Sequence, residues 1–155
     1  MTAPADVRTR RPKQHEALMI ELQQEASFPA FRDILLFAAS VGFSQGRRIP
    51  FPDGAGDPIR YETLISPTFA DALVSMIAAN EVNYDPEIMD HSRLAERVTI
   101  FEEYANGGLE YVQELVNVRK QPAALVISEL VTTALTNDDK SNDIDVAGLL
   151  GGVTW

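Results

Sequence analysis

The stretch RLAERVTIFEEYANGGLEYVQELVNV, residues 93–118, decides the predicted fold of this chain. Apolar residues recur at helical spacing on both sides of Asn106-Gly107-Gly108, which predicts an amphipathic helix that is interrupted once. A glycine inside a helix costs about 1 kcal/mol relative to alanine. Two adjacent glycines therefore indicate the end of a helix, a close approach of another backbone, or both.

Apolar patterns elsewhere in the chain predict the remaining helices of an all-α fold. Prolines and N-cap residues at helix starts, followed by apolar residues at helical spacing, indicate four further helices. These helices cover residues 12–26, 28–43, 66–79 and 123–135. In the helix over residues 66–79, the apolar residues are Phe69, Leu73, Met76 and Ile77. The sequence thus predicts a single compact domain of five or six helices.

The irregular region of this domain is GRRIPFPDGAGDP, residues 46–58. Its three prolines and three glycines exclude a regular helix or a central strand. The next residues, Ile59 to Ile65, alternate between apolar and polar side chains. They allow a short strand, but the sequence offers no partner strand for it.

The chain is expected to consist of three parts. Residues 1–11 form a disordered basic arm, residues 12–136 form the helical domain, and residues 137–155 form a tail that begins acidic and ends apolar. Terminal segments of this polar composition are commonly mobile, so we expect mobility at both ends.

Composition and charge limit the function. The absence of cysteine excludes disulfides, thiolate nucleophiles and cysteine-based zinc sites. No apolar run is long enough to span a membrane, and no signal-peptide pattern follows the basic N-terminus, so we expect a cytoplasmic protein without a membrane partner. The net charge is -10, which opposes broad contact with DNA phosphates, although the basic arm allows a weak contact.

The sequence contains no recognised catalytic or metal-binding motif. His15 and His91 lie too far apart to suggest a metal pair, and we expect both to be solvated. Glu102 and Glu103 point about 100° apart on a helix, so they are expected to form a solvated face together with Tyr104 and Glu110. We therefore predict a protein that is not an enzyme and holds no cofactor or metal; carboxylates that converge in space would be the enzymatic alternative.

Arg47, Arg48 and Arg60 form the basic group of the body, beside the aromatic ring of Phe51. Arginines on an irregular loop can bind phosphates or carboxylates through two parallel hydrogen bonds. The alternative is that they neutralise helix C-termini and local acids such as Asp53.

Three stretches together resemble a known family: RRPKQHEALMIEL, FRDILLFAASVGFSQGRRIPF and IFEEYANGGLEYVQEL. They are similar to small proteins encoded beside bacterial DNA phosphorothioation (dnd) gene clusters, the fourth dnd system-associated family. The resemblance covers residues 8–118, and EYANGG at residues 103–108 is its most distinctive part. It implies a defence locus in which sulfur replaces a phosphate oxygen of DNA.

The resemblance implies an accessory role and supplies no catalytic residues. We predict a non-enzymatic protein of an anti-phage modification or restriction system, with partners among the proteins of the same locus and a weak DNA contact through the arm and the loop arginines. The alternative is a helix-turn-helix transcriptional regulator within residues 66–118, with the two glycines as its turn, although Glu110 and Glu114 oppose DNA binding. The interaction candidates are Arg47, Arg48, Arg60, Phe51, Glu103, Tyr104, Asn106, Gly107 and Gly108.

Overall fold

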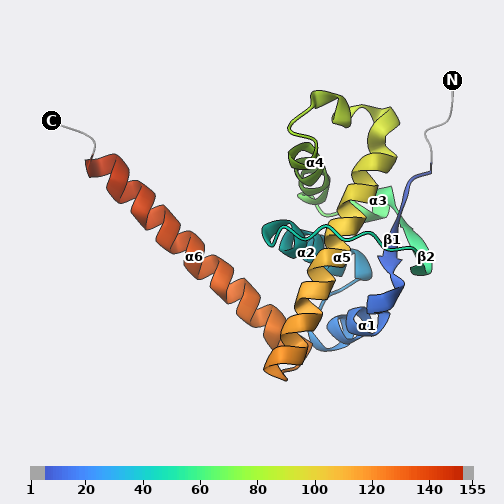
Figure 1. The fold of residues 1–155 in the computed structure, drawn as a ribbon, viewed down its shortest axis with the longest axis horizontal. Helices are drawn as coiled ribbons and strands as arrows, with labels where there is room; N and C mark the ends of the chain where they lie inside the picture. The colour runs from blue at the N-terminus through green and yellow to red at the C-terminus, as the bar shows by residue number, and fades with distance from the viewer. Residues whose placement is uncertain (1–5, 152–155) are drawn as a thin grey trace.

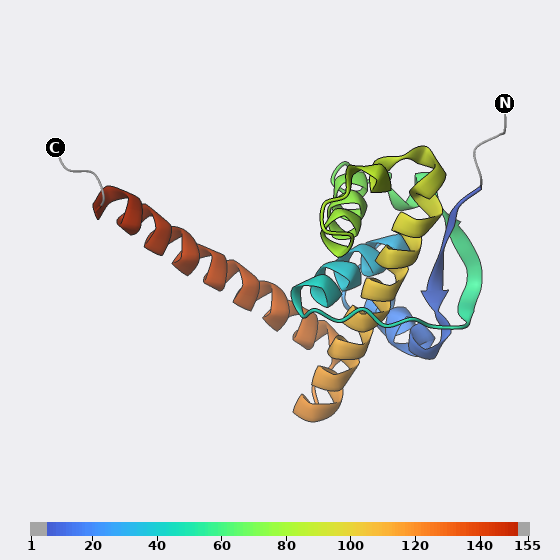
Figure 2. The same cartoon turned by 45° about the horizontal axis from the view of Figure 1, so that its top comes forward.

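The computed structural model describes residues 6–151, with side chains described for residues 6–137. This part of the chain contains six α-helices, three short 3-10 helices and one two-stranded sheet (Figures 1 and 2). The elements in order are β1 (Arg8–Pro12), η1 (Lys13–His15), α1 (Glu16–Glu25), α2 (Phe31–Ser44), β2 (Gly54–Arg60), α3 (Tyr61–Leu64), α4 (Ala70–Glu81), η2 (Pro86–Met89), η3 (His91–Arg93), α5 (Leu94–Arg119) and α6 (Ala123–Gly151). The predicted domain of five or six helices is confirmed, with a small sheet in addition.

Helix α5 runs through the middle of the domain, and α2 packs along it (Figure 1). It is one helix of 26 residues, so the predicted interruption at Asn106-Gly107-Gly108 is wrong. The turn of the helix-turn-helix alternative disappears with it, because both glycines lie inside a helix. The other role predicted for the glycines, a close backbone approach, is the one that the structure shows.

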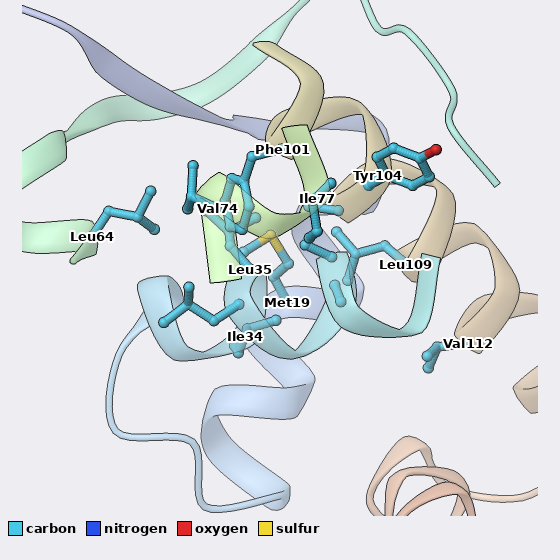
Figure 3. Packing of buried hydrophobic residues seen from close by; sticks show 14 of the residues in the cluster. Met19, Ile34, Leu35, Leu64, Val74, Ile77, Phe101, Tyr104, Leu109 and Val112 are labelled. Carbon is cyan, nitrogen blue, oxygen red and sulfur yellow. The ribbon is translucent and has the colours of Figure 1, made fainter. Parts of the chain in front are cut away.

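The hydrophobic core fills the space between α5 and the helices around it (Figure 3). Phe101 and Leu109 enter it from α5, Met19 from α1, Leu35 from α2 and Ile77 from α4. Burial of side chains of this size contributes about 1.5–3 kcal/mol each, so packing around α5 is the main stabilising contribution of the fold.

Strands β1 and β2 pair antiparallel, with Arg8 opposite Arg60 and Pro12 opposite Gly54. Residues 8–11 therefore do not belong to a disordered arm, because β2 supplies a partner strand and Thr9 is fully buried. The second strand begins at Gly54 rather than at Ile59. The exclusion of a central strand holds, since β2 has one neighbour and such an edge strand tolerates proline.

Helix α6 leaves the body and continues far beyond the predicted end at Leu135 (Figures 1 and 2). Its first two turns are packed through Ala123, Val126 and Ile127, whereas residues 131–137 are exposed. The helix also covers most of the predicted tail; residues 1–5 of the predicted arm and 152–155 of the tail lie outside the described residues. No described helix combines the length and the apolar character that crossing a membrane requires.

Candidate functional site

The segment that follows α2, residues 46–53, crosses over α5 on its way to β2, and we call it the crossing loop (Figure 1). Backbone hydrogen bonds to α2 and α5 fix its path. The Arg47 N–H donates to the Gly42 carbonyl at 2.8 Å, and the Ile49 N–H donates to the Glu103 carbonyl at 3.0 Å. The loop arginines and the EYANGG segment of α5, predicted separately from the sequence, thus lie against each other.

Three glycines make this contact possible. A Cβ atom at Gly108 would lie 1.8 Å from the Ala38 carbonyl oxygen, and one at Gly42 would lie 2.0 Å from the Tyr104 carbonyl oxygen. A Cβ atom at Gly107 would lie 2.0 Å from the carbonyl oxygen of Arg47 in the crossing loop. These distances are far below an ordinary contact, so only glycine allows α2, α5 and the crossing loop to meet backbone against backbone.

Asn106 ties the crossing loop and η1 to α5. Its side chain is completely buried, its Nδ2 donates to the Ile49 carbonyl at 3.0 Å, and its Oδ1 accepts from Gln14 Nε2 at 3.0 Å. A buried amide is stable only when its polar atoms have partners. Asn106 is therefore an internal connector and presents no surface.

Arg48 joins α4, α5 and the crossing loop. Its guanidinium donates to Glu81 at 2.6 Å and to Glu103 at 3.1 Å, and the Tyr104 hydroxyl donates to Glu81 at 2.5 Å. The hydrogen bonds from Tyr104 and Arg48 lower the pKa of Glu81. Burial and the Glu81 hydrogen bond raise the pKa of Tyr104 to about 12, so at neutral pH this cluster holds a charged carboxylate and a protonated phenol.

Arg47 lies on the outer side of the same contact. It pairs with Glu114 at 2.9 Å and with Glu110 at 3.8 Å, and its guanidinium lies 5.0 Å from the centre of the Tyr111 ring. Both loop arginines therefore neutralise acidic residues, as the second interpretation proposed. The acids are glutamates of α4 and α5 rather than Asp53, because the crossing loop carries the arginines onto those helices.

Phe51 and Arg60 do not belong to a shared surface with these arginines. Phe51 is buried, and the Arg10 guanidinium lies 4.5 Å from the centre of its ring. Arg60 is opposite Arg8 at the far end of β2. The three arginines of the predicted basic group therefore do not lie together, because the length of β2 separates Arg60 from the crossing loop that carries Arg47 and Arg48.

Sequence reasoning missed a second buried contact, between β1 and α5. Arg10 donates from Nε to Glu102 Oε2 at 3.0 Å and from its backbone N–H to Glu102 Oε1 at 3.3 Å. Glu102 is only 4 % exposed, and burial raises its pKa while Arg10 opposes the rise. The predicted solvated face is therefore wrong for Glu102, and also for Glu103 and Tyr104, since β1 and the crossing loop cover that side of α5.

His15 is also buried, against the prediction that both histidines are solvated, whereas His91 is exposed. Burial lowers the pKa of His15, which favours its neutral form at neutral pH. Among residues 6–137, no group of three or more His, Asp or Glu side chains is placed to hold a metal ion.

A groove of about 450 Å³ lies where α6 leaves the body, between α2, α5 and α6. Its apolar lining is Phe37, Val41, Tyr111, Leu130, Val131, Ala134 and Leu135. Polar and charged side chains also line this groove, including Ser40, Arg119 and Glu129. Arg119 and Glu129 pair with each other at 2.7 Å, so their charges at this groove are balanced.

The family model for DNA sulphur modification system-associated protein 4 matches residues 8–148. The chain belongs to this family. No curated protein matches the chain, and neither does any solved structure. The family match includes β1, the crossing loop and α5, and it extends well into α6, beyond the stretches on which the resemblance rested.

Membership of this family associates the chain with a DNA sulphur modification system. The distinctive EYANGG segment of this family member forms the inner contact between α5, α2 and the crossing loop. The residues of this segment serve packing: its glycines allow close backbone approach, the Asn106 amide is buried and hydrogen-bonded, and Glu103 is paired with Arg48.

Proposed function

We propose that this chain is a non-enzymatic accessory protein of a bacterial DNA phosphorothioation-linked modification or restriction system that defends against phage. It acts in the cytoplasm by binding other proteins of the same locus. The family supports the association with such a system. The exposed side chains of the domain support a mode of action through protein contacts.

One observation carries the proposal: the large apolar side chains that remain exposed are concentrated on α4 with its flanking segments and on α6. Exposed residues of this kind are Phe69, Met76, Tyr84 and Met89 on the first, and Leu125, Val131 and Leu135 on the second. Large apolar side chains that gather on one surface are typical of protein interaction sites. The arginines that suggested ligand binding are held by glutamates instead.

Contact with DNA is the weaker part of the proposal. Arg47 and Arg48 are paired with carboxylates, and the net charge of the chain is -10. Arg8 and Arg10 remain partly exposed on β1, although each also pairs with an acid. Affinity for DNA rests on neutralised phosphates, so any contact through these residues is weak and sensitive to salt.

The proposal is tested by co-expressing the tagged chain with the modification and restriction proteins encoded beside it. We expect at least one of them to co-purify in a defined ratio and to elute with the chain on size exclusion. A variant with Val131→Ser and Leu135→Ser tests α6, and Val118→Ser is the matched control, because Val118 is exposed at the end of α5. If none of these proteins binds the unaltered chain, and deletion of its gene leaves phage defence unchanged, the proposal is wrong.

A further inference from the structure

Helix α4 presents an uncharged face to solvent. Between Asp71 and Glu81 its sequence is ALVSMIAAN, without a single charged residue. One side of the helix is buried through Ala70, Val74, Ile77 and Ala78. A helix that is apolar around its circumference is normally covered on all sides, yet the side of α4 away from the core is open (Figures 1 and 2).

The exposed side carries a continuous apolar stripe. Phe69, Leu73 and Met76 follow the spacing that places residues on one helix face. Phe69 is 60 % and Met76 45 % exposed, and Leu73 between them is half-buried because it also packs against the core. Tyr84, which is 70 % exposed, extends the stripe because its hydroxyl donates to Asn80 Oδ1 at 2.8 Å, one turn beyond Met76. From Phe69 to Asn80 the stripe is about 16 Å long at 1.5 Å per residue. We call these four residues, Phe69, Leu73, Met76 and Tyr84, the α4 stripe.

The segment that carries the α4 stripe is acidic. Residues 61–96 contain seven Asp and Glu residues against one arginine, a net charge of -6. Asp71 lies at the beginning of α4, and Glu62 and Glu87 lie on the elements on either side. All three are exposed, and none of them forms an ion pair with a basic side chain within residues 6–137. The complementary charge for this surface is positive.

We infer that the α4 stripe is the docking surface for a basic amphipathic helix of a partner protein. This inference rests on the proposed function, because it assumes that the chain acts through protein contacts. The partner helix carries apolar side chains over about three turns, with Lys and Arg on both sides of them. Met76 suits such a contact, since an unbranched thioether adapts to the shape of its partner.

The first test titrates the purified chain with a synthetic peptide of about 16 residues, whose central three turns match the length of the stripe. The peptide has leucines at positions i, i+4, i+7 and i+11 and lysines on both flanks. We expect binding that weakens with salt, and backbone NMR shift changes confined to residues 69–84. A peptide with glutamates in place of the lysines should bind at least about tenfold more weakly, because like charges then face each other.

The double variant Phe69→Ser and Met76→Ser removes the two exposed side chains on either side of Leu73 and leaves the core unchanged. Its affinity for the lysine peptide should fall by about tenfold or more, the loss typical of a truncated interface anchor. Val118→Ser is the control, because Val118 is exposed near the C-terminal end of α5, outside the apolar surfaces of α4 and α6. Equal binding of the glutamate peptide, shifts mapped to α6, or an unchanged affinity of the double variant would each overturn the inference.

Co-purification separates this inference from the proposed function. If the unaltered chain retains the proteins of its locus and the Phe69 and Met76 double variant retains them equally well, the chain works through protein contacts but not through the α4 stripe. If the unaltered chain retains none of them, the proposed function itself fails. If the unaltered chain forms the complex and the double variant does not, the result supports both the proposed function and this inference.

Discussion

Replacing Gly108 with alanine tests whether the glycines of α5 serve backbone packing. In an open helix this substitution stabilises by about 1 kcal/mol, because alanine is the better helix former. Here the new Cβ atom would lie 1.8 Å from the Ala38 carbonyl oxygen, and an ordinary contact begins at 3.4 Å. The backbones of α2 and α5 must therefore separate by 1.6 Å, the difference between these two distances.

That separation loosens the core along the whole α2–α5 contact. Overpacking of a well-packed core costs about 3 kcal/mol at the upper end of the usual range, so after the gain in helix propensity we expect a net loss of about 2 kcal/mol. For a chain of this size the loss corresponds to a fall in Tm of about 6 °C.

Urea and thermal unfolding, followed by circular dichroism, measure the change. Thr99→Ala is the control, because Thr99 is exposed on the same helix and its loss should shift the free energy of unfolding by less than about 0.5 kcal/mol. If Gly108→Ala is as stable as the unaltered chain, or more stable, the close approach of α2 and α5 does not explain the glycine.

Three further predictions concern the crossing loop. Arg48→Met leaves Glu81 and Glu103 without their cation, so it should lower the free energy of unfolding, measured in urea, by about 2 kcal/mol. Arg47→Met removes ion pairs that are more exposed, so it should lower this free energy by less than about 1 kcal/mol. Equal losses in the two variants would contradict this distinction. Glu81→Gln should lower the free energy of unfolding by about 2 kcal/mol at pH 7. Because folding lowers the pKa of Glu81, the difference in this free energy between the variant and the unaltered chain should shrink as the pH falls below 4.5. A difference that is constant with pH would refute this reasoning. Asn106→Ala removes the side-chain hydrogen bond to the crossing loop, should cost about 2 kcal/mol, and should accelerate tryptic cleavage after the loop arginines; an unchanged cleavage rate would show that the loop is held by other contacts.

The sequence predicted the helices and the importance of the EYANGG segment, and it missed what covers that segment. Helical periodicity is a local property, so the helical character of the regions that became α2, α4 and α5 could be predicted from residue spacing alone. The cost of a glycine in a helix is also local, and it suggested a break. The compensating gain at Gly108 comes from α2, some 70 residues earlier in the chain, and no local pattern contains it.

Strand β1 and the buried Glu102 were missed for the same reason. A terminal segment with four basic residues is typical of a solvated arm, and β2 lies in a stretch rich in proline and glycine. Each strand is stabilised only by the other and by Arg10 on Glu102, contacts between residues more than 40 positions apart. Most of the interaction candidates meet at the contact between the crossing loop and α5, whereas Phe51 and Arg60 lie apart from it.

The exposed stripe on α4 shows a different limit. Phe69, Leu73 and Met76 follow the same apolar pattern as a buried helix face, and periodicity does not distinguish a face that packs within the chain from one that is left for a partner. Exposure in the folded domain makes that distinction.

The central position of α5 has a consequence for how the chain acquires its structure during synthesis. The helix begins at Leu94, and β1, α2, α4 and the crossing loop all rest on it. Everything that the ribosome produces before residue 94 consequently emerges without the scaffold around which it folds. The apolar segments made before α5 therefore stay uncovered until this helix has been synthesised, and transiently exposed apolar surface of this kind favours aggregation.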